Sequence, residues 1–166
     1  MSQDDELTFS FSGGLDPNDP LHQYQIMFNE MLDKAAPPEE VRVERLETQV
    51  APDGRRVRVH LRLTMYRFRP HLVLSLWDPQ GQHVAEVDII EPMSPDMEFT
   101  LHVREPQPGE YTVRVDVRYP TPEHMPKSPE EQRITRGELK PLPPMRTVTT
   151  RETRVRLLPS HAESAP

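Results

Sequence analysis

Hydrophobic and polar residues alternate with a period of two through most of the chain from Val41 onward. The clearest run covers residues 54–70 (GRRVRVHLRLTMYRFRP), where aliphatic side chains are separated by Arg, His and Thr. A period of two places alternate side chains on opposite faces of a strand. Further runs cover residues 41–50, 72–76, 83–90, 97–104, 111–118 and 147–157. Seven such runs, most of them separated by Pro or Gly turns, predict an all-β fold, an antiparallel β-sandwich.

Residues 20–36 have a helical period instead. Asp19 is suited to cap the helix, Pro20 to occupy its first position, and Pro37 to end it. One face carries apolar residues at spacings of three and four, namely Leu21, Tyr24, Phe28, Met31 and Leu32. A helix of this length is only marginally stable alone in water. We therefore expect this face to bind the chain's own core, a second copy or a partner, in cis or in trans.

These patterns divide the chain into four parts. We expect an acidic, flexible arm over residues 1–19, an amphipathic helix over 20–36, a β-sandwich over 41–158 and a disordered tail over 159–166. Within the sandwich, residues 120–144 contain seven Pro in 25 residues and have no consistent period. This Pro-rich segment is predicted to form a long loop before the last strand, with a helical turn at PEEQRI.

Two stretches show a likeness to a known architecture. LSLWDPQGQHVAEV (74–87) and PQPGEYTVRVDV (106–117) resemble the middle and penultimate strands of bacterial immunoglobulin-like and fibronectin type III-like sandwiches. Tyr111 opens a strand directly after a Pro-Gly turn, as in the tyrosine corner, where the hydroxyl bonds to nearby backbone. The chain departs from antibody-type domains because it has no Cys and because Trp77 is out of phase. The resemblance implies an immunoglobulin-like fold and no particular activity.

Composition narrows the choice of chemistry. The absence of Cys removes disulfides, thiolate nucleophiles and Cys-ligated zinc. No Gly-rich phosphate loop and no G-x-S-x-G motif is present, and carboxylate pairs such as Glu130-Glu131 stand in polar loops. His60 and His102 are expected on neighbouring strands without a third ligand. We therefore expect no catalytic residue, no metal site and no cofactor, and thus a protein that is not an enzyme.

Charge is distributed unevenly. The formal net charge is −7, and residues 1–40 contain nine acidic residues against Lys34 alone. The first residues are acidic, and no run approaches the roughly 18 apolar residues of a membrane-spanning helix. We expect a cytoplasmic protein that binds no membrane.

The outward side chains of one sheet suggest a basic face. It would comprise Arg58, His60 and Arg62 on one strand with His102 and Arg104 on the next. This face fits an acidic protein surface, including the chain's own arm. Alternatively, neighbouring acidic residues neutralise it through cross-strand ion pairs. Overall acidity, and the lack of exposed aromatic runs for base stacking, argue against nucleic acid.

Three functions remain. The first is a non-enzymatic protein–protein interaction or assembly module, which binds a protein partner or itself through the arm, the helix and the sheet faces. The second is a ligand-binding accessory domain, for example for carbohydrate, which requires Trp77, Tyr66 and Phe68 on one exposed surface. The third is a holdase-like chaperone, because flexible arms around a sandwich resemble small heat-shock proteins. The order of segments in this chain differs from that family and argues against this hypothesis. We favour the first.

Overall fold

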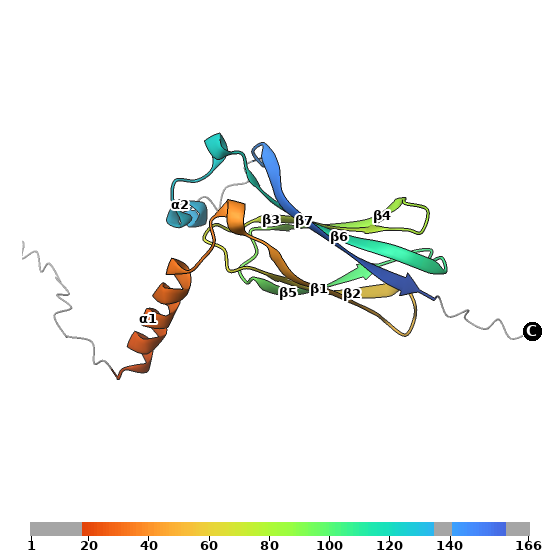
Figure 1. The fold of residues 1–166 in the computed structure, drawn as a ribbon, viewed down its shortest axis with the longest axis horizontal. Helices are drawn as coiled ribbons and strands as arrows, with labels where there is room; N and C mark the ends of the chain where they lie inside the picture. The colour runs from red at the N-terminus through yellow and green to blue at the C-terminus, as the bar shows by residue number, and fades with distance from the viewer. Residues whose placement is uncertain (1–17, 135–140, 159–166) are drawn as a thin grey trace, which may run out of the picture. The chain divides into compact units, whose positions relative to one another are not determined.

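The computed structural model describes residues 18–134 and 141–158 (Figure 1). The chain divides into two units between Lys34 and Ala35. The first unit contains helix α1 (Pro20–Asp33), and the second contains every strand of the described residues together with their other helical segments. Most of the predicted arm and all of the predicted tail lie outside the described residues.

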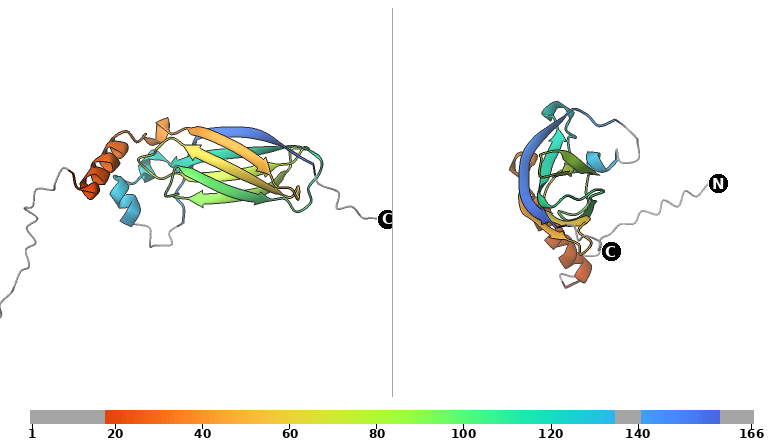
Figure 2. Two further views of the ribbon diagram at one scale, coloured as in Figure 1. Left: turned by 90° about the horizontal axis from the view of Figure 1, so that it is seen from below. Right: turned by 90° about the vertical axis from the view of Figure 1, so that its right-hand side faces the viewer.

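The second unit is an antiparallel β-sandwich (Figure 2). The smaller sheet contains, in spatial order, β1 (Val43–Val50), β2 (Arg56–Leu63) and β5 (Asp96–His102). The larger sheet contains β4 (His83–Ile90), β3 (His71–Trp77), β6 (Gly109–Pro120) and β7 (Met145–Leu157). Within the described residues, this confirms the predicted all-β fold, an antiparallel β-sandwich with seven strands. Here β4 pairs with β3, whereas the fourth strand of constant-type immunoglobulin domains joins the other sheet.

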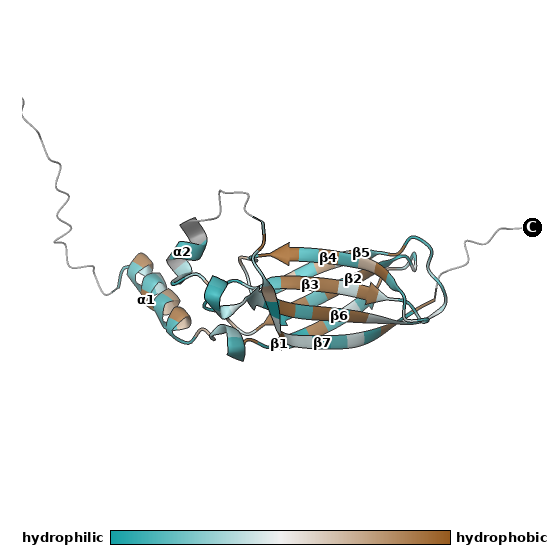
Figure 3. Cartoon of the chain, turned by 90° about the horizontal axis from the view of Figure 1, so that it is seen from above, coloured by the Kyte–Doolittle hydropathy of each residue, from teal (hydrophilic) through white to brown (hydrophobic). Residues whose placement is uncertain are grey.

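The core lies between the two sheets, where the period-two pattern directs its apolar side chains. Val59 of β2 and Val115 of β6 have no exposed surface. Along β3 and β6 the same is true of Leu72, Leu74, Leu76, Val113 and Val117. Hydrophobic residues recur along these strands in Figure 3. Burial of each such side chain contributes about 1.5–3 kcal/mol before the loss of chain entropy is subtracted.

Tyr111 forms the predicted tyrosine corner. Its side chain is 1% exposed, and the backbone N–H of Gln107 donates to its hydroxyl oxygen at 2.9 Å. The preceding turn is thereby fastened to the first residues of β6, and this detail of the prediction is confirmed.

The two long edges of the sandwich differ. At one edge Arg151 of β7 donates from Nη1 to the Val43 carbonyl oxygen of β1 at 2.8 Å. Nearby, Arg146 Nη2 lies 2.7 Å from Glu39 Oε1, in the 3₁₀ turn Pro38–Glu40. Along the other edge, several inward side chains of β4 and β5 are only partly buried, namely Ala85, Val87, Ile89, Met97 and Phe99. The sandwich is therefore fastened between β1 and β7 and more open between β4 and β5.

Helix α1 (Pro20–Asp33) is shorter than predicted. The Asp19 side chain caps it by accepting from the Leu21 N–H at 3.0 Å, as expected. Residues 35 and 36, however, lie outside the helix. Ala36 donates from its N–H to the Met65 carbonyl at 2.8 Å and accepts from the Arg67 N–H at 3.0 Å. These backbone bonds lie within the second unit and take the place of the predicted end of the helix, because tertiary contacts override a weak local preference.

The Pro-rich segment begins as β6 ends at Pro120. A 3₁₀ turn (Pro122–His124) follows, and then α2 (Pro129–Ile134), which confirms the helical turn predicted at PEEQRI. The Gln132 side chain bonds twice to the backbone of Arg69, accepting from its N–H and donating to its carbonyl, each at 2.9 Å. This contact fastens α2 beside the start of β3.

Candidate functional site

The apolar stripe that the sequence predicts on α1 is largely exposed. The exposed fractions are 76% for Leu21, 64% for Tyr24, 40% for Phe28 and 41% for Met31. Leu32 is partly buried, and no residue of α1 is fully buried. Side chains three and four residues apart share one helix face, so the predicted residues form a continuous stripe.

The predicted basic face lies on the outer surface of the smaller sheet, but acidic residues are interleaved with its central members. Arg58 Nε lies 3.0 Å from Glu98 Oε1, and His60 Nε2 lies 2.5 Å from Asp96 Oδ1. These partners come from β5, which pairs with β2.

Arg62 completes the row. Its Nε lies 3.6 Å from Glu44 Oε2 of β1. Exposed ion pairs of this kind contribute about 0–1 kcal/mol each to stability, but they remove the net positive charge of the row. The centre of this face is therefore of mixed sign.

His102 is the last residue of β5 and Arg104 follows the strand, so both lie beyond the Arg58 end of this row. The register places His102 opposite Arg56, and His60 opposite Glu98, so the two histidines are not cross-strand neighbours. Both His102 and Arg104 are exposed, and neither makes an ion pair within the described ranges. The five predicted residues thus form a neutralised row and a separate basic end.

The three aromatic residues of the carbohydrate hypothesis do not share a surface. Tyr66 is 7% exposed and donates from its hydroxyl to the Pro92 carbonyl at 2.7 Å. Phe68 packs against the core. Trp77 lies at the other end of β3, where its ring meets the His83 ring edge-on at a centroid distance of 5.0 Å. No stacking platform forms from these residues.

Buried tyrosines at one end of the sandwich hold the chain rather than perform chemistry. Burial raises the pKa of Tyr66 to about 12, and burial also raises the pKa of Tyr119. The Tyr119 hydroxyl donates to the Phe68 carbonyl at 2.8 Å. Both phenols therefore stay protonated at neutral pH and act as hydrogen-bond donors to loop carbonyls.

Among the residues that the structure describes, no three His, Asp or Glu side chains are placed to hold a metal ion. Within the same ranges, the helices are too short or too polar to span a bilayer.

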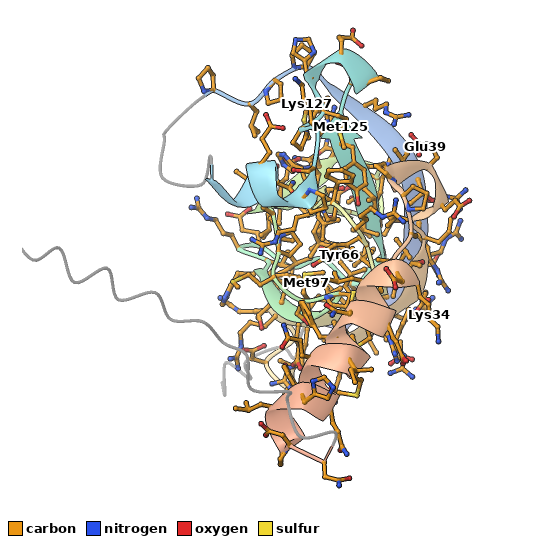
Figure 4. All side chains as sticks on the ribbon, turned by 90° about the vertical axis from the view of Figure 1, so that its left-hand side faces the viewer. Lys34, Glu39, Tyr66, Met97, Met125 and Lys127 are labelled. Atoms are coloured by element: carbon orange, nitrogen blue, oxygen red, sulfur yellow. The ribbon has the colours of Figure 1, made fainter. Side chains whose placement is uncertain are left out.

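A pocket of about 540 Å³ lies between the start of β3, the end of β4 and the Pro-rich segment. Its polar lining includes Arg69, His71 and Glu91, and its apolar lining includes Met125 and Leu142. Tyr66 and Met125 both lie at this end of the sandwich (Figure 4). Sequence analysis did not identify this pocket, because its walls come from segments without periodicity. The only signal was the density of Pro in residues 120–144.

Comparison with known proteins gives no family. No protein-family model matches the sequence, and no curated protein matches it. Parts of two solved β-glucuronidases are similar in structure. For the enzyme of Parabacteroides merdae the TM-score is 0.43 at 16% identity, over 70% of this chain and 14% of that one. For the enzyme of Bifidobacterium dentium, complexed with coumarin-3-O-glucuronide, the TM-score is 0.40 at 13% identity, over 70% of this chain and 17% of that one.

This chain therefore spans less than one fifth of either β-glucuronidase. At these TM-scores the similarity carries no argument about function.

Proposed function

We propose that this protein is a non-enzymatic protein-interaction or assembly module that binds through the apolar stripe of α1. The observation that supports the proposal is that α1 has a capped start and a one-sided hydrophobic pattern, yet none of its residues is buried. A 14-residue helix gains little stability from its backbone alone. Its apolar face is the feature that a groove, or the same face of a second copy, would cover.

The second unit begins just after α1, at Ala35. Its core is closed by long strands, and its Ala35 and Ala36 are 3% and 7% exposed. The chain that follows α1 is thus fixed to a folded body.

The basic end formed by His102 and Arg104 provides a secondary contact for an acidic partner. The neutralised row of Arg58, His60 and Arg62 contributes little, because its charges are already paired. Loss of the Arg104 guanidinium should slow association with an acidic partner at low salt. Loss of the Arg58 guanidinium should leave the association rate nearly unchanged.

Substitutions on α1 test the proposal. Tyr24→Ser with Phe28→Ser removes the centre of the stripe. Ile26→Ser removes an apolar side chain that is 45% exposed but lies off the stripe, and it serves as the matched control. The molar mass of each protein is measured by light scattering over a range of concentrations, and the proteins that co-purify with each are identified.

We expect the wild type and Ile26→Ser to share an assembly state or a co-purifying protein that the double variant has lost. The same mass and the same co-purifying proteins for all three would contradict the proposal. Circular dichroism of each variant shows whether the sandwich is intact.

A further inference from the structure

The pocket beside the Pro-rich segment contains ionisable groups of both signs, and most of them already have partners. His71 Nε2 lies 3.0 Å from Asp88 Oδ1, and His71 itself is 7% exposed. His124 Nδ1 lies 2.9 Å from Thr121 Oγ1. Each histidine is therefore engaged through one ring nitrogen, while Nδ1 of His71 is buried without a hydrogen-bond partner within the described ranges.

Two carboxylates line the pocket, those of Glu91 and Glu131, and the second already has a hydrogen-bond donor within the protein. Glu131 accepts at Oε2 from the Lys127 N–H at 2.7 Å. Arg69 and Glu91 remain, and neither side chain makes an ion pair or hydrogen bond within the described ranges. The pocket therefore presents one unpaired cation and one unpaired anion.

The backbone of Arg69 is held in place. Gln132 bonds to both its N–H and its carbonyl oxygen, each at 2.9 Å, so the guanidinium projects from a fixed base. A guanidinium offers paired N–H donors whose geometry matches a carboxylate.

Glu91 is held next to it. Its φ of 50° lies in the left-handed region, which non-glycine residues seldom adopt. Its N–H donates to the Pro70 carbonyl at 3.1 Å, directly after Arg69 in the chain. The two unpaired charges therefore stand on adjacent, fixed backbone segments, both partly buried.

Apolar side chains complete the lining. Ile90 and Leu142 are 57% and 51% exposed, and Met125 and Met145 lie near them in the wall. A volume of about 540 Å³ is in the range of small-molecule sites, roughly 300–1,000 Å³. The pocket thus combines an apolar wall with one charge of each sign.

We propose that this pocket binds a short apolar peptide in its zwitterionic form. The carboxylate of the peptide pairs with Arg69, its ammonium group pairs with Glu91, and its side chains cover Ile90, Met125 and Leu142. A ligand with a single charge would leave the other protein charge desolvated and unpaired, which is unfavourable. This site is independent of α1 and of the proposed interaction function.

Titration of the full-length chain with leucyl-leucine, followed by nuclear magnetic resonance, tests this proposal. Three capped forms isolate the charges: the N-acetyl dipeptide, the dipeptide amide and the doubly capped dipeptide. We expect the free dipeptide to shift the signals of the pocket residues at millimolar concentration. Each single cap should weaken binding about tenfold, because one charge-assisted contact is lost.

Two protein variants complete the design. Arg69→Gln should bind the free dipeptide about tenfold more weakly and should no longer distinguish it from its amide. Glu91→Gln should no longer distinguish it from the N-acetyl form. Arg67→Gln and Glu123→Gln are the controls, because both residues are exposed and neither lines the pocket. They should bind as the wild type does.

Several results would overturn the proposal. These are the absence of signal shifts with the free dipeptide, equal binding of the doubly capped form, or an unchanged preference in Arg69→Gln. Melting curves of the unliganded variants show whether each one is folded. Because α1 is unaltered throughout, a failure here leaves the test of the stripe unaffected.

Discussion

Gly109 shows how one residue can determine a turn of this sandwich. Its φ is 142°, a conformation that residues with a side chain rarely adopt. A Cβ atom at this position would lie 2.8 Å from Cγ of Pro79. The start of β6 and the turn after β3 therefore approach so closely that only hydrogen fits between them.

Gly109→Ala should lower the free energy of unfolding by about 2–4 kcal/mol, because backbone strain and a steric clash add. Gly81→Ala is the matched control. Its φ is 78°, but no atom lies within 4 Å of the added Cβ, so only the strain of about 1 kcal/mol applies. Urea denaturation of both variants measures the difference. Equal losses would show that the contact with Pro79 is unimportant.

The buried phenol of Tyr66 should make the free energy of unfolding decrease at alkaline pH. Burial raises its pKa to about 12, whereas a phenol in the unfolded chain ionises near pH ~10. Above this lower value the unfolded chain releases a proton that the folded chain retains. The contribution of Tyr66 to the free energy of unfolding should therefore be constant below about pH 10 and fall as the pH rises toward 12.

Tyr66→Phe should reduce the steepness of this alkaline loss, because Phe has no proton to release. Tyr24→Phe should leave the steepness unchanged, since Tyr24 is 64% exposed. Urea denaturation at a series of pH values gives the slopes. The same slope in Tyr66→Phe and wild type would refute the assignment.

At the scale of elements, the seam between β1 and β7 determines how the two sheets are held together. Arg151 donates across it to the Val43 carbonyl. Arg154, on the same strand, pairs with Glu110 of β6 within one sheet, with its side chain 73% exposed. Substitution of Arg151 therefore tests a contact between the two sheets, and substitution of Arg154 tests an exposed contact within one sheet.

Arg151→Met should lower the free energy of unfolding by about 1–2 kcal/mol, because it leaves a partly buried carbonyl without its charged donor. Arg154→Met should change it by less than about 0.5 kcal/mol, as is usual for exposed pairs. Thermal and urea unfolding of both proteins provide the measurement. A larger loss for Arg154→Met would contradict this view of the seam.

The elements that sequence reasoning predicted are those in which the chain's own pattern carries the information. Each side chain along β2 faces core or solvent according to its place in the alternation, as Val59 and Arg58 show. Tyr111 was predictable because a tyrosine corner is a local arrangement. The end of α1 was not, since Ala36 pairs with the backbone of Met65 and Arg67, far along the sequence.

The candidate sites show the same division. The α1 stripe follows from spacing within one helix. The ion pairs of Arg58 and His60 depend on the register of β2 with β5, which alternation does not specify. The pocket depends on three distant segments, and Arg69 has no distinguishing feature in the sequence before Gln132 is placed beside it.

At the scale of the whole molecule, the chain joins two units of different character. From Ala35 onward it has a dense core between two sheets and a fastened edge. Up to Lys34 it has a capped helix without a single buried residue. We propose that this helix, whose apolar side chains are exposed, completes its packing on another molecule.

Hydrogen exchange of the α1 amides in the full-length protein tests this claim most directly. The measurement compares the assembled or partner-bound protein with Tyr24→Ser/Phe28→Ser under the same conditions. We predict strong protection of residues 20–33 in the assembled wild type and rapid exchange in the variant, while the β2 and β6 amides stay protected in both. Equally rapid exchange of α1 in both proteins, with the assembly intact, would show that α1 is not the binding element.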